Sequence, residues 1–218
     1  MERAALITGG SSGIGLAIAR ALREDGFELT LAARTREKVE AAAQELGALA
    51  VAADVADDAD CRRIVDEHRG RHGRLDVLVN SAGVGIAGNI ADLPTKHLDL
   101  QLDVNLRGLM LVTAAALPLL REAQQHLSVA IDEAMAAVLV TEGGSIRTTG
   151  ALAGLSENAV GPRLARTRLL AAYGSETGRV TAAGVERARY DLEEGRHRDG
   201  TDLPEPPPPM RFRARRPI

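Results

Sequence analysis

Cysteine, lysine and aromatic residues are scarce in this chain of 218 residues, and each shortage limits what the protein can be. Cys61 is the single cysteine, so an internal disulfide is excluded, which fits a reducing compartment. Tryptophan is absent and aromatic residues make up 2% of the chain, so Leu, Ala, Val and Ile must build the hydrophobic core. Lysine occurs only at Lys38 and Lys96, so the second half of the chain offers no ammonium group to a catalytic site.

The composition gives little support to a role at membranes or on nucleic acids. The formal net charge of −3 provides no excess of positive charge for binding phosphate backbones. Residues 108–120 form the longest apolar stretch, which Thr113 and Pro118 interrupt and which is shorter than the ~20 residues of a membrane-spanning helix. No signal peptide is recognisable before the apolar residues 4–8. We therefore expect a soluble, cytoplasmic protein that binds neither nucleic acid nor membranes.

Short apolar runs alternate with helical patterns over the first 123 residues. The runs that have the length and composition of strands are residues 4–8, 28–33, 48–53 and 75–80. In the helical segment between the last two, Cys61, Ile64, Val65 and His68 recur at the spacing of one helix face. This alternation predicts an α/β fold, a doubly wound parallel sheet with helices on both faces.

Two segments extend this organisation. The helix expected over residues 104–120 is apolar nearly all round, so we expect the sheet to bury one side and a second subunit of a homo-oligomer to cover another. After residue 123 the rhythm weakens, and residues 136–140 fit either a helix or a strand. We expect one domain over residues 1–195, whose atypical half, 124–195, lacks the last strands of the sheet. Residues 196–218 hold six of the nine prolines and are expected to form a disordered tail.

A glycine-rich turn joins the first strand to the first helix. Gly9, Gly13 and Gly15 follow one another in the order G-x-x-x-G-x-G. Such glycines permit a tight turn and let a pyrophosphate approach the backbone at the positive N-terminus of the helix. The spacing differs from the G-x-G-x-x-G of the common dinucleotide-binding fingerprint.

This turn and the motifs that follow it resemble the short-chain dehydrogenase/reductase family. T-G-x-x-x-G-I-G matches residues 8–15, D-V matches residues 54–55, and N-S-A-G at residues 80–83 departs by one residue from the usual N-N-A-G. Asn105, in D-V-N-L-R-G, matches the asparagine of the family's catalytic proton relay. The resemblance covers residues 1 to about 120. It implies a Rossmann-type oxidoreductase that transfers hydride between a nicotinamide dinucleotide and a carbonyl or alcohol substrate.

Arg34 bears on which dinucleotide is bound. It ends the second strand, 19 residues past Gly15, where an acidic residue would bind a free ribose 2′-hydroxyl. An arginine there can instead pair with a 2′-phosphate, and Arg36 could assist it. We therefore favour NADP(H) over NAD(H), although an arginine at a strand end can also be an ordinary surface residue. The residues expected to bind the cofactor are Thr8, Gly9, Ser11, Ser12, Gly13, Ile14, Gly15, Arg34, Asp54, Val55, Asn80, Ala82 and Gly83.

The resemblance also implies a catalytic serine, which this chain does not match. Residues 143–154, G-G-S-I-R-T-T-G-A-L-A-G, resemble the family's fifth strand, after which the serine should lie. Aligned on the glycines, the position of the serine holds Ala151. Thr148 and Thr149 are hydroxyl-bearing neighbours at shifted positions.

Tyr173 resembles the tyrosine of the family's Y-x-x-x-K segment and is expected on a helix that begins at Pro162. The lysine position holds Thr177. Free tyrosine has a pKa near 10, so a phenol that exchanges a proton near neutral pH needs a cation one helical turn away. Tyr173 and Asn105 are thus the catalytic candidates, without the serine and the lysine.

Three interpretations of the whole chain remain open at this point: an NADP(H)-dependent oxidoreductase, a nucleotide-binding protein without catalysis, and a truncated or frameshifted family product. Tyr173 fits an active-site remnant and, as well, a structural residue that packs on Leu169 and Leu170. His68 and His72 have the i, i+4 spacing of a metal-binding pair, but a third ligand is lacking. We expect a solvated helix end there and no metal site.

Overall fold

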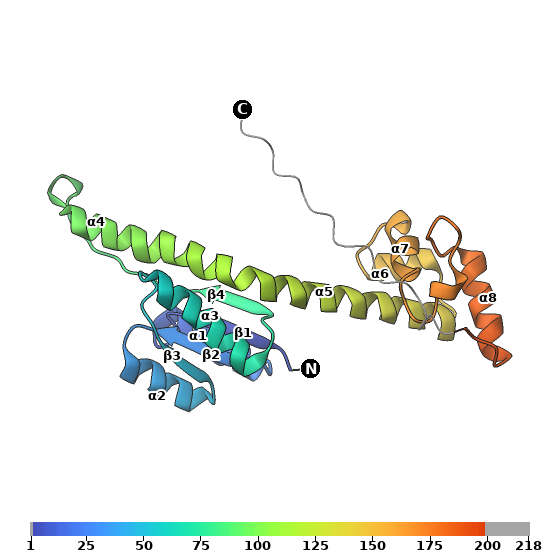
Figure 1. The fold of residues 1–218 in the computed structure, drawn as a ribbon, viewed down its shortest axis with the longest axis horizontal. Coiled ribbons are helices and arrows are strands. Elements are labelled where there is room, and N and C mark those ends of the chain that lie inside the picture. The colour runs from blue at the N-terminus through green and yellow to red at the C-terminus, as the bar shows by residue number, and fades with distance from the viewer. Residues whose placement is uncertain (1, 199–218) are drawn as a thin grey trace. The chain divides into compact units, whose positions relative to one another are not determined.

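The computed structural model describes residues 2–198 and divides the chain into two compact units (Figure 1). The first unit is Met1–Gln125, and the second begins at His126, close to where the sequence pattern changes. Helix α5, Leu109–Thr141, contributes its first part to the first unit and its last part to the second. The prediction of a disordered tail over residues 196–218 lies outside the described residues except for residues 196–198.

Within the described residues, the strands form one parallel sheet of four strands in the order β3-β2-β1-β4. The strands are β1 (Ala4–Thr8), β2 (Glu28–Ala33), β3 (Leu49–Ala52) and β4 (Val77–Asn80). This order is the first part of a doubly wound fold. The predicted fold class is confirmed, and β3 and β4 are somewhat shorter than the apolar runs from which they were predicted.

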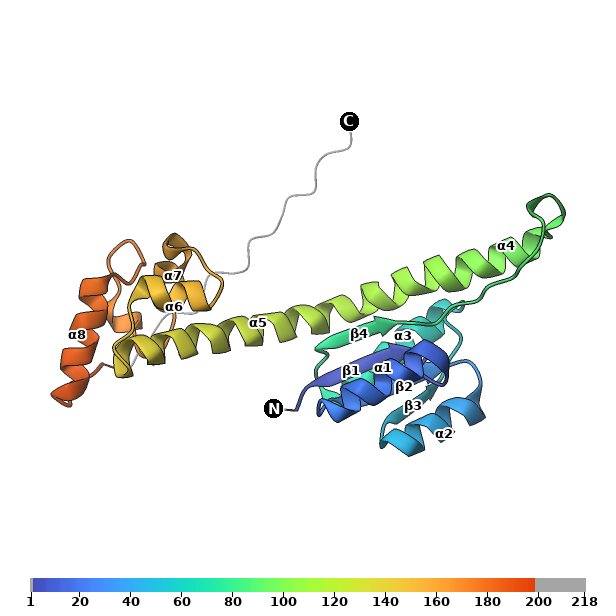
Figure 2. The same cartoon turned by 180° about the vertical axis from the view of Figure 1, so that it is seen from behind.

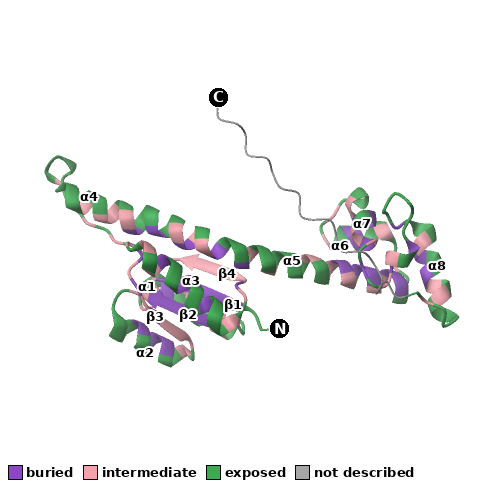
Figure 3. Ribbon diagram, in the orientation of Figure 1, coloured by how far each residue is buried: buried purple, intermediate pink, exposed green. Residues whose placement is uncertain are grey.

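Helices cover both faces of this sheet, because successive side chains of each strand point to opposite faces. Ala5 and Ile7 of β1 pack in one core with helices α1 (Gly13–Glu24) and α2 (Arg36–Leu46). Leu6, between them, packs with helix α3 (Asp58–His72) and with α5. Figure 1 shows α3 in front of the sheet, and Figure 2, the view from behind, shows the other face of the sheet with α1. In Figure 3 the central strands β1 and β2 are mostly coloured as buried.

A continuous helical stretch, Thr95–Thr141, begins after the 3₁₀ turn η1 (Ile90–Asp92). It comprises helix α4 (Thr95–Leu102), the π-helical segment η2 (Asp103–Gly108) and α5. The helix expected over residues 104–120 is thus present, and it continues through Pro118 to Thr141. By length and composition the stretch could cross a membrane, with a mean hydropathy of 1.4 over its most apolar window. Core helices of soluble proteins meet the same criterion, so this finding is weak evidence.

Only one side of residues 104–120 is buried within the first unit. Val104, Val112, Ala116 and Leu119 pack against the sheet and α3. The side expected to meet a second subunit is exposed in this chain (Figure 3). Its apolar side chains are Leu106, Leu109, Met110 and Leu117, which are 39–59% exposed.

Helices are the regular elements of the second unit over its described residues, and loops connect them. Beside the last part of α5 it contains α6 (Ile146–Leu152), α7 (Glu157–Leu164), the 3₁₀ turn η3 (Ala171–Tyr173) and α8 (Ala182–Glu193). Residues 136–140, which fitted either a helix or a strand, are helical. Their apolar side chains join Leu164, Leu170 and Val185 in a separate core.

Two expectations for this unit were wrong. Residues 143–154, expected to resemble a strand, contain helix α6 and no strand. The Ser145 hydroxyl accepts from the N–H of Thr148, and the Thr148 side chain accepts from the N–H of Ser145, so the two residues make a reciprocal capping box that starts the helix. Pro162 does not begin the helix that carries Tyr173. It lies inside α7, which ends at Leu164, and Tyr173 ends η3.

Candidate dinucleotide site

The glycine-rich turn between β1 and α1 is packed so tightly that side chains are excluded from it. Gly9 has a φ of 67°, and a Cβ atom there would lie 2.7 Å from backbone atoms of Ser81 and Ala82. A Cβ atom on Gly15 would overlap the carbonyl oxygen of Gly9. The glycines are therefore needed because the turn, the first turn of α1 and the loop after β4 meet backbone against backbone.

The N-terminus of α1 is open to an anion. Ser12 occupies the N-cap position, but its side chain makes no capping hydrogen bond, and the first turn holds no acidic residue. Gly13 has a φ of 55° with open space where a side chain would lie, and Ile14 beside it is 76% exposed. Uncapped N–H groups and the positive end of the helix dipole make such a terminus a binding site for phosphate.

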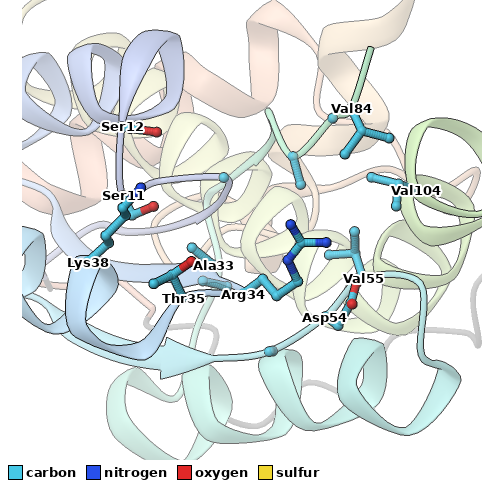
Figure 4. A pocket seen from close by; sticks show the side chains of 15 residues that line it. Ser11, Ser12, Ala33, Arg34, Thr35, Lys38, Asp54, Val55, Val84 and Val104 are labelled. Atoms are coloured by element: carbon cyan, nitrogen blue, oxygen red, sulfur yellow. The ribbon is translucent and has the colours of Figure 1, made fainter. Parts of the chain in front are cut away.

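A pocket with a cavity of about 230 Å³ opens beside this turn, at the carboxyl ends of the parallel strands (Figure 4). All of its lining residues belong to the first unit. The expected cofactor residues that line it are Gly9, Ser11, Ser12, Arg34, Asp54, Val55, Ala82 and Gly83. The ends of doubly wound strands are where such folds bind ligands, so the pocket lies where the fold predicts it.

Sequence reasoning missed some of the lining residues. They are Ala32, Ala33, Thr35, Lys38, Ala53, Val84 and Val104. Lys38 carried a recognisable signal, because it is a cation in the first turn of α2, four residues after Arg34. Arg36, which was expected to assist Arg34, does not line the pocket and is ion-paired with Glu40 at 3.2 Å.

Two predicted residues outside the pocket hold the loops that form it. The Thr8 hydroxyl donates to the carbonyl of Val79 at 3.4 Å and accepts from the N–H of Ala82 at 3.3 Å. The Asn80 amide donates to the Thr113 hydroxyl at 3.0 Å, while its buried Oδ1 has no hydrogen-bond partner among the described residues. Both side chains therefore fix the end of β4 against its neighbours.

Asp54 shapes the turn that follows β3. Its Oδ1 accepts from the N–H of Ala56 at 3.0 Å, and its own N–H donates to Oδ2 of Asp60 at 2.8 Å. This N–H, followed by the guanidinium of Arg63, lowers the pKa of Asp60 below its usual value. The turn presents Asp54 and Val55 to the pocket.

Asn105 clamps the loop after β4. Its Oδ1 accepts from the N–H of Val84 and its Nδ2 donates to the carbonyl of Val84, both at 2.8 Å. The residue lies in η2, and Val84 lines the pocket. Asn105 is therefore brought beside the dinucleotide pocket, where its amide positions a lining loop; its role in a proton relay stays a prediction.

Tyr173 lies in the core of the second unit, where it is 8% exposed and packs with Leu170. Its hydroxyl donates to Oδ2 of Asp191 at 3.2 Å and accepts from the N–H of Arg198 at 3.1 Å. Its ring lies 5.3 Å from that of His197, centroid to centroid. The phenol thus has two hydrogen-bond partners of its own unit.

The positions of the missing catalytic partners also lie in the second unit. Ala151 is exposed on α6, and the Thr177 hydroxyl, on an exposed loop, lies 2.8 Å from that of Ser175. Neither position has the serine or the lysine that the resemblance requires.

The expectation of a solvated helix end at His68 was wrong, because its side chain is fully buried. Its Nε2 lies 2.9 Å from the carbonyl oxygen of Arg74 and its Nδ1 lies 2.8 Å from the Thr30 hydroxyl. A carbonyl can only accept, so Nε2 carries the proton and Thr30 donates to Nδ1. Burial lowers the pKa of His68 to about 4. No group of three metal-ligating side chains occurs among the described residues.

The fold and the pocket define a dinucleotide-binding unit, and comparisons with known proteins identify its family. The family model described as short chain dehydrogenase matches residues 3–132, and the chain belongs to this short-chain dehydrogenase/reductase family. The oxidoreductase UcpA of Salmonella typhimurium is 40% identical over 121 residues, which are 53% of this chain and 46% of that protein. An uncharacterised oxidoreductase of Staphylococcus epidermidis is 35% identical over 129 residues, 58% of this chain and 56% of that one.

Solved structures match the same region. A 3-ketoacyl-(acyl-carrier-protein) reductase from Brucella melitensis, complexed with NADH, has a TM-score of 0.54 and 35% identity, covering 55% of this chain and 51% of that one. A short chain dehydrogenase from Burkholderia cenocepacia, in complex with NADP, has a TM-score of 0.52 and 38% identity, with coverages of 55% and 51%. The chain spans about half the length of the relatives that it matches.

Proposed function

We propose that the first unit binds NADP(H) and that Arg34 selects it over NAD(H). The observation that carries this proposal is the position of Arg34 on the lining of the pocket, at the end of β2 (Figure 4). A guanidinium there offers charge-assisted hydrogen bonds to an adenosine 2′-phosphate. Matched structures contain both kinds of cofactor, NADP in one and NADH in another, so the preference rests on this side chain.

The rest of the pocket fits the other parts of the dinucleotide. The uncapped N-terminus of α1, with Ser11 and Gly13, would hold the pyrophosphate. Asp54 and Val55 would meet the adenine end. When bound, the nicotinamide supplies the hydride for reduction of a carbonyl or accepts one from an alcohol.

We infer that any hydride transfer by this chain is slow. The family's activity makes a carbonyl or alcohol the expected substrate class, but Ala151 and Thr177 stand where a serine and a lysine are needed. A missing hydrogen-bond donor to the substrate oxygen alone costs about 10²–10³-fold in rate. The bonds of Tyr173 to Asp191 and Arg198 favour a second candidate function, a cytoplasmic nucleotide-binding protein without catalysis.

The end of the family match at residue 132 supports a third possibility, a frameshifted product of a family gene. Reading the encoding DNA in all three frames near codons 123–180 tests it. A frame that restores the serine and Y-x-x-x-K would establish the frameshift, and three frames without them would exclude it.

A homo-oligomer through residues 104–120 remains part of the proposal. Association of two copies would bury the apolar side chains that this segment exposes to water in the single chain. Light scattering coupled to size-exclusion chromatography tests it, and a monomer at micromolar concentration would contradict it.

Titration of nucleotide fluorescence tests the cofactor preference, and the lack of tryptophan keeps protein emission low. We expect NADPH to bind more tightly than NADH, and Arg34→Asp to narrow or reverse the difference. A charge-assisted pair is worth ~1.5–3 kcal/mol, or roughly ten- to a hundredfold in affinity. Equal affinities of the two nucleotides for the parent protein would contradict the proposal.

A further inference from the structure

The helix that follows Arg34 brings further cations near the pocket, and the structure distinguishes between them. Arg36 and Lys38 both lie in the first turn of α2. The guanidinium of Arg36 is held by the carboxylate of Glu40, one helical turn away, and is not part of the pocket lining. Lys38 lines the pocket, and no hydrogen bond or ion pair is seen for its ammonium group within residues 2–198.

Figure 4 shows Arg34, Thr35 and Lys38 along one edge of the pocket, with Ser11 near Lys38. Thr35 occupies the N-cap position of α2, yet its side chain makes no capping hydrogen bond. Its hydroxyl is therefore not used to stabilise its own helix. Arg34, Thr35 and Lys38 therefore all line the same pocket, and in Figure 4 the Lys38 side chain extends toward Ser11 while the guanidinium of Arg34 extends toward Val55.

A second cation answers an electrostatic need of the proposed ligand. A phosphate monoester carries about −1.5 to −2 charges at pH 7, because its second pKa is near 6. One guanidinium compensates only part of that charge. An ammonium group on a flexible stem can approach the remaining phosphate oxygens as a compact point charge, whereas a guanidinium binds through its planar fork.

We propose that Lys38 is a second specificity-determining residue, which holds the adenosine 2′-phosphate together with Arg34. This inference rests on the proposed binding of NADP(H). Arg36, in contrast, contributes nothing specific to the 2′-phosphate, although it lies closer to Arg34 in the sequence.

The test measures the affinities of NADPH and NADH for the full chain and for Lys38→Gln, with Arg36→Gln as the matched control. Both variants remove one positive charge from the first turn of the same helix. We expect Lys38→Gln to weaken NADPH roughly tenfold and to leave NADH within about twofold, in line with a charge-assisted hydrogen bond. We expect Arg36→Gln to leave the ratio of the NADPH and NADH affinities unchanged. Lys38→Arg should keep most of the preference for NADPH, because it keeps the positive charge.

Adenosine 2′,5′-bisphosphate and ADP, used as competitors, assign the effect to the 2′-phosphate. Lys38→Gln should weaken the binding of adenosine 2′,5′-bisphosphate and leave the binding of ADP unchanged. Equal effects of Lys38→Gln and Arg36→Gln would overturn the inference, as would a loss of NADH affinity equal to that of NADPH. If the parent binds both nucleotides but discriminates only through Arg34, the inference fails while the proposed function stands. If the parent binds neither nucleotide, both fail.

Discussion

Gly108 allows the closest backbone approach that bears on the dinucleotide pocket. It ends η2 and is buried against Val55, which lines the pocket. A Cβ atom on Gly108 would overlap the carbonyl oxygen of Val55 and lie 3.0 Å from its carbonyl carbon. Because the obstructing atoms belong to the backbone, Gly108→Ala must displace either the helix or the loop after β3.

The expected magnitude is the difference between two opposing effects. Overpacking typically costs about 1–3 kcal/mol, and a clash with backbone belongs at the upper end. Replacing a helical glycine by alanine contributes about 1 kcal/mol in the opposite direction. We therefore expect Gly108→Ala to destabilise the first unit by about 2 kcal/mol. It should also weaken NADPH binding, because each of the two segments that can be displaced carries a residue of the pocket lining, Val104 in η2 or Val55 after β3.

Gly70→Ala provides the matched control. Gly70 also lies in a helix, α3, and nothing lies within 4 Å of the position that its Cβ would take. With no clash to oppose the gain in helix propensity, this variant should stabilise the first unit by about 0.5–1 kcal/mol.

Hydrogen exchange of the β1 and β2 amides, followed by mass spectrometry, measures the stability of the first unit directly. Tyrosine fluorescence would not serve, because Tyr173 and Tyr190 both lie in the second unit. A loss of 2 kcal/mol corresponds to roughly thirtyfold faster exchange, and the control should exchange more slowly than the parent. Exchange in Gly108→Ala as slow as in the parent would refute the reasoning.

Two further predictions concern buried polar side chains. The pKa of His68 is lowered to about 4 in the folded state, so the free energy of unfolding should fall by about 3 kcal/mol as the pH drops from 6.5 to 4. Urea unfolding followed by circular dichroism measures this pH dependence, and His68→Leu should remove the part that is due to His68. The same pH dependence in the parent and in His68→Leu would contradict the lowered pKa. Tyr173→Phe should lower the stability of the second unit by about 1 kcal/mol, through the lost bonds to Asp191 and Arg198, and leave the slow oxidation of NADPH by aldehydes, ketones and quinones unchanged. Robust turnover that this substitution abolishes would show that the phenol performs the chemistry.

The local pattern of residues 1–123 was sufficient to predict the sheet and the tight glycine-rich turn after β1. Strands with continuous apolar runs must be buried on both faces, and their alternation with helices leaves a parallel sheet as the solution. The glycines of the turn were recognisable because the backbone geometry that they permit is a property of the residue itself. The structure added the reason for Gly9 and Gly15, which is contact with backbone from distant segments.

Other side chains depended on contacts that no spacing reveals. The periodicity placed His68 on a buried face, yet a histidine near a helix end also suggested solvent, and only the positions of Thr30 and Arg74 show how its two nitrogens are satisfied. Arg36 and Lys38 are both cations near Arg34 in the sequence. The structure shows that Arg36 is ion-paired with Glu40, whereas Lys38 lines the pocket.

By itself, then, the sequence determined the class of the first unit, because strand alternation and glycine turns are encoded by neighbours in the chain. Only the tertiary structure decided the second unit, where the capping box at Ser145 overrode the resemblance to a strand and Tyr173 became a core residue bonded to Asp191. The physical reason is that a sequence motif gives only the order of residues along the chain. The role of a side chain such as the Tyr173 phenol depends on the groups that folding brings within about 3 Å of it.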